Sequence, residues 1–122
     1  MTRELIGQVN LRNTYRVYKD GSGYLVVGEN RRGQSYESKI SHKSVSYLKG
    51  RLRGQRVNAE QAAKVLAPKA ESFKLSYTYG DKLRYSAQHV LLVLVALGDA
   101  TVVKEGRSYV YSIRGGIDEY KE

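Results

Sequence analysis

The chain has 122 residues and no cysteine, and it carries 21 Lys and Arg against 12 Asp and Glu, a formal net charge of +9. This length suits one domain whose core can fold without a disulfide or a metal. The absence of cysteine excludes disulfide bonds, a thiolate nucleophile and cysteine-based zinc sites. The longest apolar run, VLLVLVAL, is far shorter than the roughly 20 residues that span a bilayer, and MTRELIGQVNLRN has no apolar signal segment. We therefore expect a cytoplasmic protein with an anionic partner and no membrane partner.

The first half of the chain predicts antiparallel strands followed by a helix. Residues 13–20 and 24–27 alternate on either side of a glycine-rich turn, which is a hairpin signal. Residues 35–40 are expected to form a third strand. In the helix predicted for 41–53, Ser41 caps the start and an apolar stripe leaves the remaining surface basic.

The second half predicts two further helices, a strand and a hairpin. Asn58 caps a helix that Pro68 ends, and the alternation of 73–79 predicts a strand. Ser86 is expected to cap an apolar helix at 87–97, at the centre of the core. A hairpin follows at 101–113, with its turn at the glycine of residue 106.

Together these elements predict an α+β fold, an antiparallel β-sheet of about four to five strands with three or more helices packed on one side. A single nucleic-acid-binding domain is expected over residues 1–116. Residues 117–122 form a short acidic C-terminal tail.

Catalytic signals are weak throughout the sequence. Of the two histidines, His42 lies in the basic helix, and His89 lies in the apolar one, where a hydrogen-bonded core residue is the ordinary interpretation. No HExxH, EF-hand or Walker pattern is present, and the glycine-rich segments are turns. We expect no enzyme, no catalytic residue, no metal and no cofactor.

Positive charge is concentrated in one region of the sequence. Residues 31–56 contain eight basic residues and one acid, a net charge of +7. A solvated helix face usually mixes both signs, so this distribution favours binding to a polyanion, whose phosphates exchange condensed counterions for Lys and Arg. The expected phosphate contacts are Arg31, Arg32, Lys43, Lys49, Arg51, Arg53 and Arg56.

Tyrosine is the second unusual feature, with eleven residues against one phenylalanine. A core would use phenylalanine as readily, because a buried hydroxyl needs a hydrogen-bond partner. Exposed rings can instead stack on unpaired bases. The candidate stacking residues are Tyr18, Tyr24, Tyr36, Tyr47, Tyr77 and Tyr79. Together with the basic residues they predict sequence-tolerant binding of single-stranded DNA, and RNA stays open.

Two other functions also fit the sequence. A double-stranded DNA-binding regulator would use the N-terminal strands and the 41–53 helix in the major groove. A non-enzymatic protein-interaction subunit would use the same basic residues on an acidic partner. A winged-helix reader at 86–113 is excluded, because its recognition helix would be VLLVLVAL, which cannot face DNA.

The order of several segments resembles one known family. YRVYKDGSGYLVV, the basic RRGQSYESKISHKSVSYLKGRLRG, NAEQAAKVLAP and FKLSYTY follow one another as in the ThermoDBP-type single-stranded DNA-binding proteins of thermophilic archaea. The resemblance implies an archaeal, thermophilic source and a four-stranded antiparallel sheet that forms, with helices, an aromatic cleft flanked by basic residues. It also implies a homodimer formed through a C-terminal zipper, although no heptad follows Gly116. The resemblance covers element order and composition and assigns no site residue.

Overall fold

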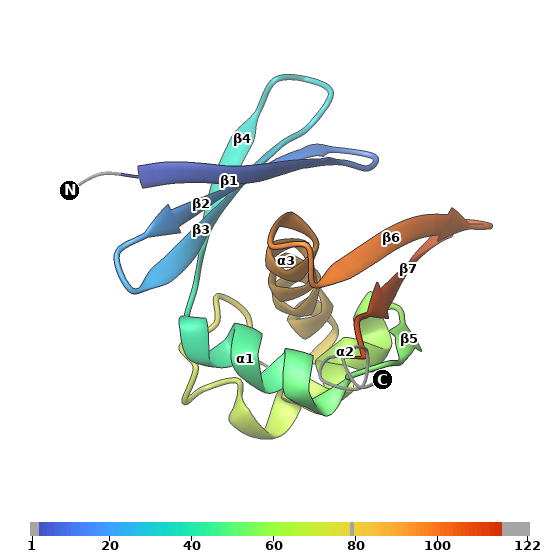
Figure 1. The fold of residues 1–122 in the computed structure, drawn as a ribbon. Helices are drawn as coiled ribbons and strands as arrows, with labels where there is room; N and C mark the ends of the chain where they lie inside the picture. Colours follow the sequence, from blue (N-terminus) through green and yellow to red (C-terminus); the bar gives the residue numbers. More distant parts are fainter. Residues whose placement is uncertain (1–2, 79, 116–122) are drawn as a thin grey trace, which may run out of the picture.

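The computed structural model describes residues 3–78 and 80–115, which form a four-stranded antiparallel sheet, a three-stranded antiparallel sheet and three α-helices (Figure 1). The α+β class is as predicted, but the strands form two sheets where one was expected. No helix in the described ranges is long and apolar enough to cross a membrane. The predicted acidic tail at 117–122 lies outside the described residues.

The larger sheet has the strand order β1-β2-β3-β4. Its strands are β1 (Arg3–Asn10), β2 (Thr14–Asp20), β3 (Gly23–Glu29) and β4 (Ser35–Ile40). Strand β1 was not predicted, because a register shift between Leu5 and Gly7 interrupts its alternation. Since neighbouring strands are antiparallel, the β1–β2 and β3–β4 turns lie at one end of the sheet, and the chain enters the first helix at the other end (Figure 1).

The three α-helices are α1 (His42–Arg51), α2 (Ala59–Leu66) and α3 (Leu83–Ala96). Two caps have the predicted form: the Ser41 hydroxyl accepts a hydrogen bond from the amide of Ser44, and Asn58 and Gln61 form a reciprocal capping box. Short 3-10 turns at Ala67–Lys69 and Gly80–Lys82 lie between α2 and α3.

The smaller sheet has the order β5-β7-β6. Its strands are β5 (Arg56–Val57), β6 (Ala100–Glu105) and β7 (Ser108–Ile113). The predicted hairpin is present, and Gly106 adopts a φ of 63° in its turn. Such a backbone conformation is easily accessible only to glycine.

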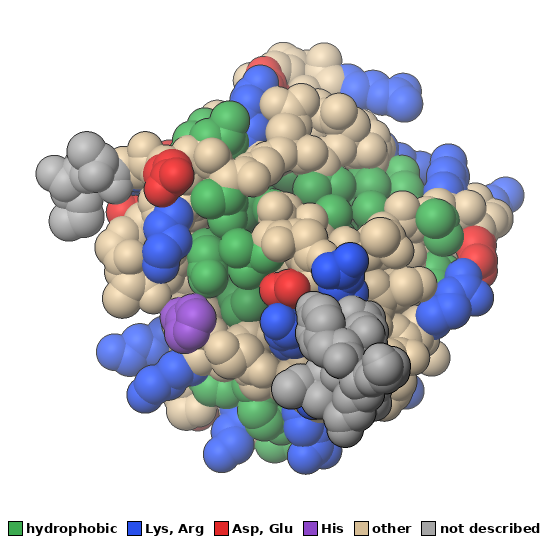
Figure 2. All heavy atoms as spheres, in the orientation of Figure 1, with side chains coloured by type: hydrophobic (Ala, Val, Ile, Leu, Met, Phe, Trp, Pro, Cys, Tyr) green, Lys and Arg blue, Asp and Glu red, His purple; other side chains and the backbone are tan. Residues whose placement is uncertain are grey.

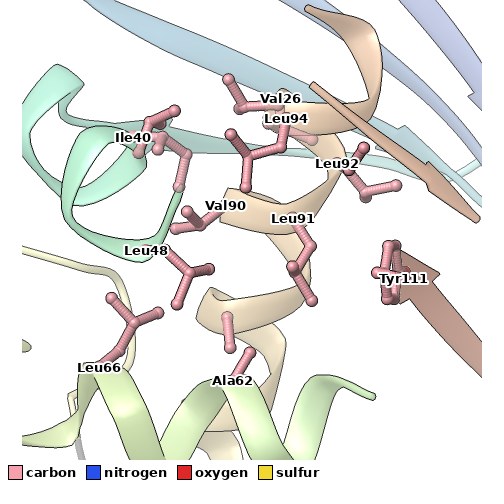
Figure 3. Packing of buried hydrophobic residues seen from close by; sticks show 14 of the residues in the cluster. Val26, Ile40, Leu48, Ala62, Leu66, Val90, Leu91, Leu92, Leu94 and Tyr111 are labelled. Carbon is pink, nitrogen blue, oxygen red and sulfur yellow. The ribbon is translucent and has the colours of Figure 1, made fainter. Parts of the chain in front are cut away.

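Helix α3 is the centre of the core, as its composition predicts. Nine of its 14 residues are buried. Figure 3 shows side chains from β3, α1, α2 and β7 around it, with Leu94 close to Val26 and Leu91 on the side of Tyr111. The helix therefore packs against both sheets and both other helices.

The prediction of a strand at 73–79 is wrong, because no strand forms over the described residues 73–78. Over the described part of this segment the chain runs in turns, with Lys74 at a φ of 57°. The backbone of Tyr77 bonds to a side chain instead of a neighbouring strand: its amide donates to Ser86 Oγ (2.9 Å), and Ser86 Oγ donates to its carbonyl (3.0 Å). Ser86 is consequently not the helix cap that was expected, because α3 already begins at Leu83.

Strand β1 approaches α3 at Gly7. A Cβ atom at this position would lie 2.9 Å from Ala96 Cβ and 3.1 Å from Ala96 Cα. Both distances are shorter than ordinary van der Waals contact, and the second involves helix backbone that cannot rotate away. Only glycine lets the strand lie this close to the core helix.

We predict that Gly7→Ala lowers the free energy of unfolding by about 1–3 kcal/mol through overpacking. The measurement is chemical denaturation followed by circular dichroism. Gly50→Ala is the matched control: a Cβ at this α1 position meets nothing within 4 Å, so this variant should gain up to about 1 kcal/mol of helix stability. Equal stability of Gly7→Ala and wild type would contradict the close β1–α3 contact.

Candidate nucleic-acid interface

The basic residues predicted to form one patch lie at two ends of the molecule. Arg31 and Arg32 are exposed in the β3–β4 turn, at the end of the larger sheet remote from α1. The other five lie on α1 or between α1 and the end of β5. Figure 2 shows Lys and Arg side chains over α1 along the lower edge and again near the β3–β4 turn. The predicted patch is therefore two separate basic surfaces.

Three of the predicted phosphate contacts already interact with other side chains. Lys49 Nζ lies 3.2 Å from the Asp99 carboxylate. Arg56 forms an ion pair and hydrogen bond with Glu105. The Arg51 guanidinium lies over the Tyr47 ring, 5.8 Å from its centroid. A phosphate would have to compete with an acid at the first two positions.

Four of the predicted stacking residues are poorly placed or not described. Tyr24 is only 7% exposed, so we leave it out of the proposed stacking set. Tyr18 is half-buried and alternates with core-facing Val17, which puts it on the outer face of the sheet. Tyr47 is half-buried against Phe73, with ring centroids 5.4 Å apart. Tyr79 lies outside the described residues.

The other two predicted rings, Tyr36 and Tyr77, lie in one cleft. Together with Tyr85 they are 42–44% exposed and line a hollow of about 500 Å³ beside His89. The Tyr77 and Tyr85 ring centroids are 6.0 Å apart at 59°, and those of Tyr36 and His89 are 6.0 Å apart at 40°. Polar atoms come from Glu37, Ser38 and Ser76. We call this hollow, bounded by β4, the loop before α3 and the start of α3, the aromatic cleft.

The position of Tyr36 depends on the glycine opposite it. Gly28 pairs with Tyr36 across β3 and β4, and a Cβ at Gly28 would lie 2.6 Å from the Tyr36 Cζ atom. The ring therefore lies over the bare glycine backbone. Its hydroxyl donates a long hydrogen bond, 3.5 Å, to the Tyr15 hydroxyl. Burial raises the pKa of Tyr15, so the Tyr15 hydroxyl stays protonated at neutral pH.

His89 forms part of the cleft wall and is 5% exposed. Burial lowers its pKa to about 4, because the charged form loses hydration without gaining an acidic partner. Its Nδ1 atom is buried and has no hydrogen-bond partner among the described residues. At neutral pH the ring is therefore an uncharged aromatic surface.

A second hollow, of about 430 Å³, adjoins the cleft. Arg12 of the β1–β2 turn, Arg84 of α3 and Arg107 of the β6–β7 turn all line it. None of the three forms an ion pair within the described ranges. The wall is completed by Asn58, Ala59, Glu60, Tyr85, Gln88, Ser108, Tyr109 and Tyr111. We call it the arginine hollow.

Tyr85 lines both hollows, so they adjoin at this residue, and we refer to the two together as the groove. The Arg84 guanidinium lies 5.1 Å from the Tyr85 ring centroid, and Lys82 Nζ lies 5.8 Å from that of Tyr77. Cations over aromatic faces at these distances hold the rings in place while keeping their charge in solvent. Exposed rings and unpaired positive charge thus meet along the start of α3.

The arginines and Tyr85 were not among the sites predicted from sequence. Arg12, Arg84 and Arg107 lie in three distant segments, and none belongs to a run of basic residues. The only local signal is that Arg12 and Arg107 occupy tight turns, whose residues are generally exposed. Their convergence is a property of the fold.

The chain matches no protein-family model, no curated protein and no solved structure. No group of three or more His, Cys, Asp and Glu that could hold a metal ion occurs in the part of the chain that the structure describes. Function has to be inferred from the chemistry of the groove, because a fold alone does not specify it.

We predict that His89 makes stability depend on pH. Its pKa is lower in the folded than in the unfolded protein, so the unfolded state binds more protons as the pH falls. Stability is therefore fully present above about pH 6.5 and decreases towards pH 4, by up to roughly 3 kcal/mol. Urea denaturation at several pH values measures this, with His89→Gln as the comparison. An equal loss between pH 6.5 and 4 in both proteins would contradict the assignment to His89.

Proposed function

We propose that this protein binds single-stranded DNA, and RNA as well, with little sequence preference, in the groove formed by the aromatic cleft and the arginine hollow. The observation that supports this most directly is the shared wall at Tyr85. It puts exposed rings beside arginines that form no ion pair within the described ranges. The proposal concerns binding alone and assigns no catalytic residue.

The two hollows offer the two contacts that a single strand needs. Bases that are not paired can stack on Tyr36, Tyr77 and Tyr85, and each stacked base contributes about 1–3 kcal/mol. Arg12, Arg84 and Arg107 can contact phosphates and release their counterions. Every base has a π-face and every nucleotide a phosphate, so such a groove tolerates most sequences.

Arg31 and Arg32 can extend the phosphate path. Their turn lies at the same end of the larger sheet as the β1–β2 turn that carries Arg12. Both are exposed and form no ion pair among the described residues. The basic residues of α1, at the other end of the sheet, lie outside this path. They are the alternative surface for a duplex or an acidic protein.

The α3 helix does not serve as a reader of duplex DNA in this proposal. The second half of the chain has the order that the winged-helix hypothesis requires, with α3 before the β6–β7 hairpin. A recognition helix needs a polar face in the major groove. The apolar part of α3 is buried instead, with Val90 to Leu94 fully enclosed. The exposed residues of α3 are Arg84 and Tyr85, in its first turn.

We predict that the protein binds a labelled single-stranded oligonucleotide more tightly than its duplex in fluorescence anisotropy titrations at several salt concentrations. Arg84→Gln should weaken binding to all sequences alike and make the log–log salt slope shallower by about 0.7, the value for one lost phosphate contact. Arg53→Gln, with the same charge change at an exposed position beside α1, is the matched control.

The opposite order of the two variants would move the site to the α1 surface. A preference for duplex would favour the double-stranded DNA-binding regulator. No binding to either form at low salt would reject nucleic acid as the ligand and leave the protein-interaction alternative.

We also predict that Gly28→Ala weakens single-strand binding by roughly fivefold, the equivalent of about 1 kcal/mol of stacking. The added Cβ displaces the Tyr36 ring without removing any aromatic ring or charge. Gly50→Ala, with open space at its Cβ, is the control in the same titration. Unchanged affinity of Gly28→Ala, in a variant shown to be folded, would exclude Tyr36 as a stacking surface.

A further inference from the structure

The arginine hollow has a feature that binding of a strand along a groove does not require. Its three arginines come from three separate elements and line one space. Three like charges so placed repel one another. Glu60 is the only acidic residue in the lining, and it forms no ion pair with them among the described residues. The arrangement calls for an anion with more than one negative charge.

Two further groups in the wall can donate hydrogen bonds to such an anion. Ala59 and Glu60 begin α2, so their amides have no acceptor within the helix. The same end of the helix carries the positive side of its dipole. Their chemistry matches that of the arginines, which also only donate.

Tyr111 is a third potential donor in the wall of this hollow, next to Gln88. Its side chain lines the hollow and is 1% exposed. Among the described residues its hydroxyl makes no hydrogen bond of ordinary geometry, and Gln88, in the same wall, is its nearest hydrogen-bonding neighbour. Burial raises its pKa to about 12, so the hydroxyl is protonated and can donate. Buried hydroxyls are ordinarily paired, and an unpaired one destabilises the fold.

We infer that the arginine hollow is a subsite for a terminal phosphate, the phosphomonoester at the end of a nucleic-acid strand. Such a group carries close to two negative charges and three unesterified oxygens, whereas a phosphate inside the strand has one charge and two free oxygens. Three arginines around one space suit the former. The terminal base then lies at Tyr85, at the junction with the aromatic cleft. This inference rests on the proposed function and adds recognition of a strand end to it.

The test compares the affinities of one oligonucleotide carrying a 5′-phosphate, a 3′-phosphate or no terminal phosphate. Wild type is expected to prefer one phosphorylated form by about tenfold, because charge-assisted hydrogen bonds are the strong ones. Arg107→Gln should abolish the preference. Lys104→Gln, on the same hairpin but outside the hollow, should keep it.

Tyr111→Phe separates an effect on recognition of the terminal phosphate from an effect on the stability of the free protein. The buried hydroxyl makes no hydrogen bond of ordinary geometry among the described residues, so its loss should leave the free protein about as stable as wild type, while the preference for the phosphorylated strand falls. A preference that persists in both Arg107→Gln and Tyr111→Phe would overturn the assignment to this hollow.

Equal affinity of wild type for all three strands would overturn the terminal-phosphate inference and leave single-strand binding intact. Failure of every strand to bind at low salt would overturn both. Titration with inorganic phosphate, followed by phosphorus NMR, adds a readout that needs no strand: line broadening with wild type and not with Arg107→Gln supports the subsite, and no broadening with either protein counts against it.

Discussion

The burial of α3 is the constraint on which the rest of this structure depends. An apolar helix of this kind must be covered on nearly every side, and one sheet with two helices could not do so alone. The larger sheet, the smaller sheet, α1 and α2 all pack against it. Because the two sheets approach the helix from different sides, they leave a space between them at its start, where the chain is polar. The groove is a consequence of covering the core helix.

The candidate site and the buried core meet at the first turns of α3. Ser86 holds the backbone of Tyr77 through two hydrogen bonds, and the His89 ring lies beside the Tyr36 ring, with centroids 6.0 Å apart. Arg84 and Tyr85, on the exposed side, join the two hollows. A rigid, buried helix thus positions rings and charges that come from loops, an arrangement common in binding sites. His89 and Tyr111, whose buried polar atoms make no hydrogen bond of ordinary geometry within the described ranges, border these same hollows.

Most of the secondary structure could be predicted from the local periodicity of apolar residues, from capping residues and from glycine turns. The hairpins, the caps of α1 and α2 and the core position of α3 depend on neighbours within a few residues, so they could be predicted. The segment from Phe73 alternates as a strand does, but Ser86 binds the backbone of Tyr77. The Phe73 ring packs against Tyr47 of α1, and the Tyr77 ring packs against Tyr85 of α3. The alternation of strand β1 is interrupted by a register shift between Leu5 and Gly7, and Gly7 is required by the close approach of α3. In both places a tertiary contact outweighed the local preference.

The sequence by itself determined the α+β class, the basic and tyrosine-rich character and the identity of the core helix, because composition and periodicity are local quantities. Only the tertiary structure decided which charges and rings share a surface. Arg31 and Arg51, close in sequence, lie at opposite ends of the larger sheet, since antiparallel strands return the chain by their full length. Arg12, Arg84 and Arg107, far apart in sequence, line one hollow because α3 holds their three elements together. Long-range packing sets these positions, and a local pattern cannot encode it.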